Sequence, residues 1–112
     1  MNTYSVAILD QADADLERTL NRLVMISVET AVDWQVGFES ALSSLTSLPN
    51  RCPKARDGGH YPGVVVRQLY YGKYRLLFHV VEADADETEG AVIVLRVLYG
   101  SQSMDYNPRD EA

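Results

Sequence analysis

The spacing of apolar residues differs between residues 10–49 and the part of the chain from residue 64 onward. Over residues 10–49 apolar side chains recur every three or four residues, which is the period of an amphipathic helix. From residue 64 onward, β-branched and aromatic residues dominate, as in strands. A short apolar run at residues 4–9 precedes the helical part and predicts a first strand. The pattern therefore predicts the element order β-α-α-β-β-β.

The helical part divides into two helices at Ser27. Asp10 is expected to cap the first helix and Ser27 the second, while Pro49 is expected to end the second. Because the connection is very short, we expect an antiparallel helical hairpin. The apolar faces that must be covered are Ala12, Leu16, Leu20, Leu23 and Val24 on the first helix, and Ala31, Trp34, Phe38, Ala41, Leu42, Leu45 and Leu48 on the second.

The second half predicts three strands at residues 64–71, 74–81 and 91–99. Gly72 and Lys73 form the tight turn between the first two of these strands, and an acidic turn precedes the third. The sequence thus predicts an α+β fold, with the hairpin packed on a mostly antiparallel four-stranded sheet. Residues 1–102 are expected to form one domain, and residues 103–112 a loose polar tail.

Length and composition narrow the class of protein. A chain of 112 residues is a single domain. It has no apolar run long enough to span a membrane and no recognisable signal peptide, so a cytoplasmic location is expected. Cys52 is the only cysteine, which excludes an internal disulfide.

Charge is distributed unevenly around a net value of −6. Residues 51–82 hold six basic and two acidic side chains, whereas the segments on either side are both acidic. An anion-binding surface therefore belongs to this middle segment. Alternatively, its basic side chains balance acidic neighbours.

Each of the last three strands carries one arginine among apolar residues: Arg67, Arg75 and Arg96. Alternation places Arg96 on one face with Val92, Val94 and Leu98. An arginine on a half-buried strand is costly unless it is paired or faces water. Either the sheet face opposite the helices is partly open, where guanidinium groups could clamp phosphate, or these arginines form salt bridges with the acidic helix or tail.

No motif points to a metal or a cofactor, and we expect neither. His60 and His79 lack partners at ligand spacing, and there is no phosphate-binding glycine loop or nucleophilic serine elbow. Acid–base chemistry would have to come from tyrosine, arginine, lysine or histidine side chains.

Five segments, taken in order, resemble one protein family. They are the leucine-periodic helix that reaches Leu48 and Pro49, the R-C-P loop at Arg51, R-Q-L-Y-Y-G-K from Arg67, Y-R-L-L-F from Tyr74, and V-L-R-V-L-Y-G ending at Gly100. Together they resemble the RelE/ParE toxin superfamily over residues 4–102. The long helical hairpin is more similar to the ParE branch.

This resemblance implies the toxin of a type II toxin–antitoxin module, which a cognate antitoxin neutralises. The RelE branch implies ribosome-dependent cleavage of mRNA, and the ParE branch implies inhibition of DNA gyrase. A homodimer and a toxin–antitoxin heterotetramer both suit the family, and no membrane is involved. By the resemblance Arg67, Arg75 and Tyr99 are catalytic candidates, and Arg51, Lys54, Arg56, Lys73 and Arg96 are expected to contact the substrate or target.

The end of the last strand departs from the family pattern. Relatives often have a histidine, a glycine and an arginine there, whereas this chain reads L-Y-G-S-Q from Leu98 to Gln102. The loss of the arginine removes a phosphate clamp, so we favour an inhibitor that binds a protein such as gyrase. The alternatives are a metal-independent, ribosome-dependent endoribonuclease and an inactive homologue that acts as a protein-interaction module.

Overall fold

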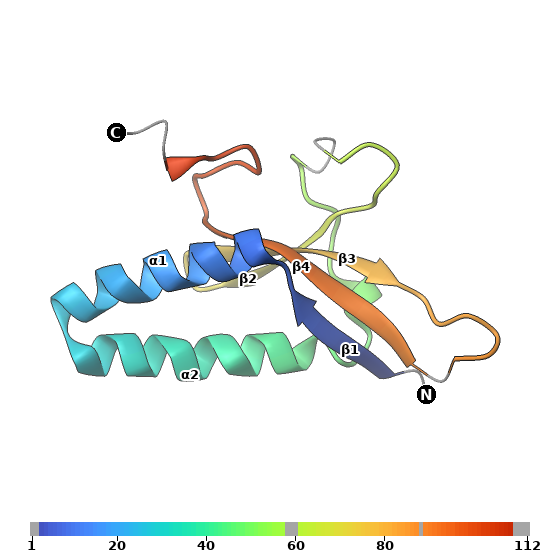
Figure 1. Ribbon diagram of the computed structural model, residues 1–112, viewed down its shortest axis with the longest axis horizontal. Helices are drawn as coiled ribbons and strands as arrows, with labels where there is room; N and C mark the ends of the chain where they lie inside the picture. The colour runs from blue at the N-terminus through green and yellow to red at the C-terminus, as the bar shows by residue number, and fades with distance from the viewer. Residues whose placement is uncertain (1–2, 58–60, 88, 109–112) are drawn as a thin grey trace.

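The computed structural model describes residues 3–57, 61–87 and 89–108. Strand β1 (Thr3–Ile8) leads into helix α1 (Asp10–Ile26), and helix α2 (Val28–Ser44) returns antiparallel to it (Figure 1). A short 3-10 turn, η1 (Pro49–Arg51), precedes β2 (Arg67–Tyr71), β3 (Tyr74–Val81) and β4 (Glu89–Tyr99). The predicted order and the α+β class are confirmed.

The four strands form one sheet in the order β1-β4-β3-β2. β2, β3 and β4 make an antiparallel meander, whereas β1 pairs with β4 in parallel. β1 and β2 are therefore the edge strands, and the expectation of a mostly antiparallel sheet is confirmed. In Figure 1 the helical hairpin projects well beyond the end of the sheet.

The helix boundaries follow the sequence signals only in part. Ser27 caps α2 as expected, because its hydroxyl accepts a hydrogen bond from the Thr30 amide at 2.9 Å. The prediction that Asp10 caps α1 is wrong, since Leu9 holds the cap position with its own amide bonded to Val94 of β4. The expected end at Pro49 is also wrong: α2 stops at Ser44, and Pro49 begins η1 instead.

The main core lies between the hairpin and the sheet. Its centre is aromatic: the rings of Trp34 and Phe38 stack with centroids 5.2 Å apart, and Tyr71 from β2 packs against both. The Tyr71 hydroxyl donates a hydrogen bond to the Trp34 carbonyl at 2.8 Å. This contact passes directly over Gly37, where a Cβ would overlap the Tyr71 hydroxyl.

We expect Gly37→Ala to lower the free energy of unfolding by about 1–3 kcal/mol, because a packed, rigid tyrosine must be displaced. Helix propensity alone predicts the opposite, a gain of about 1 kcal/mol. Urea unfolding measures the sign, with Ser43→Ala on the exposed part of α2 as the control. In a Tyr71→Phe background, which removes the hydroxyl, the loss should shrink. Stabilisation by Gly37→Ala would contradict the close approach.

A second, smaller core covers the other face of the sheet. Val66, Leu77, Leu95, Leu98 and Met104 are buried there beneath the loop that follows η1 and the C-terminal segment. The expected open face is therefore wrong for this part of the sheet, and so is the expected looseness of the tail around Met104. Residues 109–112 of that tail lie outside the described residues.

A β-bulge in β4 explains why simple alternation failed for Arg96. Leu77 pairs with Arg96 and Phe78 with Val94, so Leu95 is an extra residue in the ladder. Such an insertion shifts the alternation of side chains beyond it by one residue. Val94 belongs to the main core and Leu98 to the second one, on opposite faces.

Candidate functional site

Arg75 of β3 lies at the centre of a polar cluster inside the second core. Its side chain is fully buried and bonds both carboxylate oxygens of Asp57, at 3.0 and 2.9 Å. It also donates to the Gln68 side chain at 3.0 Å and to the Gln102 carbonyl at 2.7 Å. Asp57 in turn accepts the Met104 amide at 3.0 Å. The planar fork that would hold a phosphate is thus occupied by the protein's own carboxylate.

The hydrogen bond from Arg75 holds the pKa of Asp57 below its usual range, even though partial burial acts in the opposite direction. Because the folded pKa is depressed, the stability that Asp57 contributes is present above about pH 4 and is lost as the pH falls through the folded value. We expect the stability difference between the parent and Asp57→Asn to shrink below about pH 4. Urea unfolding at several pH values measures it, and the exposed Asp13→Asn change should show a much weaker trend.

Arg96 of β4 is held in a second buried ion pair. Its Nε and one terminal nitrogen bond the two carboxylate oxygens of Asp15 on α1, at 2.7 and 2.9 Å. Its other terminal nitrogen donates to the carbonyls of Met104 and Tyr106. Asp15 also accepts the Val97 amide at 3.0 Å, at a point on β4 beyond the end of β1. The Asp15 carboxylate therefore accepts hydrogen bonds both from an unpaired strand amide and from the buried Arg96 guanidinium.

The remaining basic candidates are spread over the surface rather than gathered. Arg51 donates to the carbonyls of Ser47 and Leu48 just after α2, at 2.8 and 3.0 Å, and to the Ser44 carbonyl at the end of that helix at 3.4 Å. Arg67 donates to the Cys52 carbonyl at 2.7 Å. The other three are exposed. The backbone of Lys54 forms an isolated antiparallel β-bridge with that of Arg67, and Arg56 donates to the Gly100 carbonyl at 3.2 Å. Lys73 lies in the turn before β3.

Cys52 is buried, and burial raises the pKa of its thiol despite the opposing influence of Arg51 and Arg67. A raised pKa leaves little of the thiolate that nucleophilic chemistry needs. In the described part of the chain, no group of three metal-ligating side chains gathers where it could hold an ion. No described helix combines the length and the apolar character required to cross a membrane.

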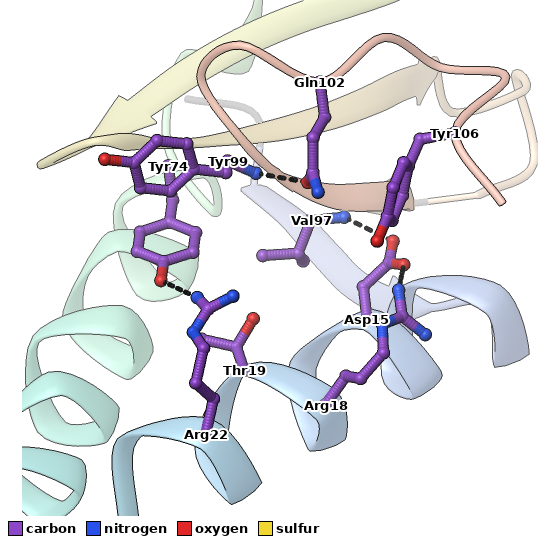
Figure 2. A pocket seen from close by; sticks show the side chains of 9 residues that line it. All are labelled: Asp15, Arg18, Thr19, Arg22, Tyr74, Val97, Tyr99, Gln102 and Tyr106. Carbon is purple, nitrogen blue, oxygen red and sulfur yellow. Dashed lines mark hydrogen bonds and ion pairs between the residues drawn. The ribbon is translucent and has the colours of Figure 1, made fainter. Parts of the chain in front are cut away.

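Tyr99 lies at the edge of a pocket of about 160 Å³ between α1 and the end of β4 (Figure 2). Its ring packs edge-on against Tyr74 with centroids 5.3 Å apart, and its amide donates to the Gln102 side chain at 3.0 Å. Figure 2 shows Arg22 reaching from α1 to the Tyr74 hydroxyl, with which it forms a hydrogen bond. The other lining residues are Asp15, Arg18, Thr19, Val97 and Tyr106.

Sequence reasoning missed this pocket and both carboxylates. Asp15 lies in an acidic helical segment and Asp57 in a loop, and nothing beside them in the sequence indicates that either pairs with a strand arginine. Arg18 and Arg22 belong to the acidic first half of the chain, so the charge count directed attention elsewhere. The one available signal was the alternative that strand arginines pair with the acidic helix, which Asp15 fulfils.

The chain matches no protein-family model and no curated protein. Among solved structures it is similar to a chain of the chromosomal ParDE TA system from P. aeruginosa, at 19% identity and a TM-score of 0.62, covering 87% of this chain and 96% of that one. A chain of the toxin–antitoxin complex RelBE2 from Mycobacterium tuberculosis is also found. It is 26% identical at a TM-score of 0.47, with coverage of 87% and 98%. The chain therefore has the fold found in the ParDE toxin–antitoxin structure, and the RelE/ParE resemblance of its sequence is confirmed at the level of the fold.

Proposed function

We propose that this chain is the toxin of a type II toxin–antitoxin module, and that it acts by binding and inhibiting an essential protein, as ParE-like toxins inhibit DNA gyrase. One observation carries the choice of a protein-binding mode. Arg75 and Arg96, two of the cations that a ribonuclease would place on RNA, are each paired with a carboxylate of the chain itself. A phosphorane-like transition state needs cations that are free to meet it.

The exposed apolar surface of the helical hairpin supports binding to proteins. Met25 and Ile26 at the turn are 86% and 70% exposed, and Val28, Val32 and Val36 form an exposed stripe along α2. We call these five residues the hairpin stripe. Contiguous exposed apolar patches of this kind mark interaction sites. β-branched residues are also poor choices for a solvated helix face, so solvent exposure alone does not explain them.

The charge of α2 favours one kind of partner for the hairpin stripe. α2 carries Glu29, Asp33 and Glu39, all exposed, and has no basic residue. A second copy of this chain would bring like charges together there, whereas a helix with apolar anchors and basic flanks would complement the surface. We therefore assign the hairpin stripe to an amphipathic segment of the cognate antitoxin, docking as a helix.

Growth of a bacterial culture after tightly induced expression of this chain tests the proposed mode of action. We expect arrest with a DNA-damage response and intact mRNA, read from the same samples. Tyr99→Phe should be as toxic as the parent, because a protein-binding inhibitor does not need this hydroxyl as an acid or base. Arg75→Ala is a poor test variant, since it leaves the partly buried Asp57 without its counter-charge.

The other outcomes decide between the alternatives. Arrest with cleaved mRNA, abolished by Tyr99→Phe while the variant stays folded, would establish a ribonuclease and overturn the proposal. Unimpeded growth with soluble protein would establish an inactive homologue whose remaining role is to bind other proteins.

A further inference from the structure

The pocket beside Tyr99 contains more basic than acidic side chains. Of the nine side chains that line it in the described part of the chain, Asp15 is the only acidic one. Asp15 already serves the guanidinium groups of Arg18 and Arg96. Arg22, in the same pocket, donates to the neutral Tyr74 hydroxyl. Positive charge therefore exceeds negative charge at this point, although the whole protein carries a net charge of −6.

The pocket is lined by buried side chains whose positions are fixed by packing. Asp15, Thr19, Val97 and Tyr74 are buried and form its floor, while Arg22 and Tyr99 stand at the exposed rim. Tyr74 is fixed by edge-on ring contacts with both Trp34 and Tyr99, at 5.2 and 5.3 Å between centroids. A fixed phenol beside an exposed guanidinium presents hydrogen-bond donors of the kind that hold an oxyanion.

We infer that this pocket binds a single compact oxyanion, a carboxylate or a phosphate group, with Arg22 as its principal cation and the hydroxyl of Tyr74 as a second donor. Bound there, the anion would supply the counter-charge that Arg22 does not find among the described residues. The pocket adjoins the Arg75 cluster through Gln102, which lines the pocket and whose carbonyl accepts a hydrogen bond from Arg75 at 2.7 Å. The Arg75 side chain is not among the residues that line the pocket.

A polynucleotide is not the expected ligand. α1 carries Asp10, Asp13 and Glu17 at exposed positions close to the residues that line the pocket. A polyanion lying along this helix would meet repulsion at each of them, whereas a single oxyanion entering the pocket would not. The oxyanion can come from a free phosphate compound or from an acidic side chain of a bound protein, and the two sources share the same chemistry at Arg22.

Titration of the ¹⁵N-labelled full chain tests the inference, with inorganic phosphate in one arm and acetate in the other. Ionic strength is held constant with chloride. We expect saturable shifts of the Arg22 Nε–H and Tyr99 amide signals. Arg22→Gln should weaken binding at least about tenfold, the usual effect of losing one charge-assisted hydrogen bond. Tyr74→Phe keeps the ring packing and should also weaken binding, whereas Tyr70→Phe, which removes an exposed tyrosine hydroxyl outside the pocket, should not.

The two arms distinguish the source of the oxyanion. Tighter binding of phosphate would indicate a phosphorylated small molecule, and tighter binding of acetate an acidic side chain of a partner. Absence of a saturable shift in both arms would overturn the inference, as would shifts that persist undiminished in a folded Arg22→Gln variant. Arg22 would then serve only to brace α1 against β3.

Discussion

Asp15→Ala is expected to lower the free energy of unfolding by about 3–5 kcal/mol, the usual cost of removing one member of a buried ion pair. Both side chains of the Asp15–Arg96 pair are 1% exposed. The substitution leaves the Arg96 guanidinium buried with only carbonyl partners, and it also deprives the Val97 amide of its acceptor. Since small domains are stable by only about 5–15 kcal/mol, much of the fold's stability depends on this carboxylate.

Asp13→Ala is the matched control, because it removes the same charge from an exposed position on the same helix. It should change the stability by no more than about 0.5 kcal/mol. Asp15→Asn keeps the shape and some hydrogen bonds but loses the charge, so its effect should be intermediate. Equal losses for Asp13→Ala and Asp15→Ala in urea unfolding would show that the buried pair contributes nothing net.

The double change Val32→Glu and Val36→Glu is expected to weaken binding of the proposed antitoxin by about 30-fold or more, which is the scale of losing a hot spot. It places two carboxylates within the hairpin stripe, where apolar anchors should be buried by the partner. Both valines are more than half exposed in the free chain, so its own stability should change little. Isothermal titration with the co-encoded antitoxin measures the affinity.

Gln11→Glu provides the control, since it adds a carboxylate at an exposed position near the start of α1, away from the hairpin turn. Its affinity should match that of the parent. If the double variant bound as tightly as the parent, the antitoxin would have to dock elsewhere, and the exposed edge of β1 would be the next surface to test. Growth after co-expression gives a second readout, because a toxin that escapes its antitoxin arrests the culture.

Local sequence signals predicted the elements of this fold well. Ser27 identified the break between the helices, and Gly72 marked the turn before Tyr74, because capping and turn chemistry depend on a few neighbouring residues. The predicted bounds of β3 are those that the structure shows. The order of the elements then left few topologies for a chain of this size.

Such local signals could not predict the buried ion pairs of the molecule. The partner of Arg96 lies 81 residues away, and nothing near Asp15 distinguishes it from the other acids of α1. The bulge at Leu95 adds one residue to an otherwise regular strand, and period-two counting cannot detect where the insertion falls. The roles assigned to Arg67, Arg75 and Tyr99 stay predictions, although the structure already places the three in separate surroundings.

The parallel pairing of β1 with β4 has a consequence for synthesis of the protein in the cell. Residues 3–8 find their partners only at residues 89–94, so the edge of the sheet cannot form until most of the chain has left the ribosome. Contacts this distant along the sequence form late in folding. The nascent chain therefore stays incompletely folded until β4 has been made. For the toxin proposed above, this delay would give an antitoxin that is already present time to bind the chain as it folds.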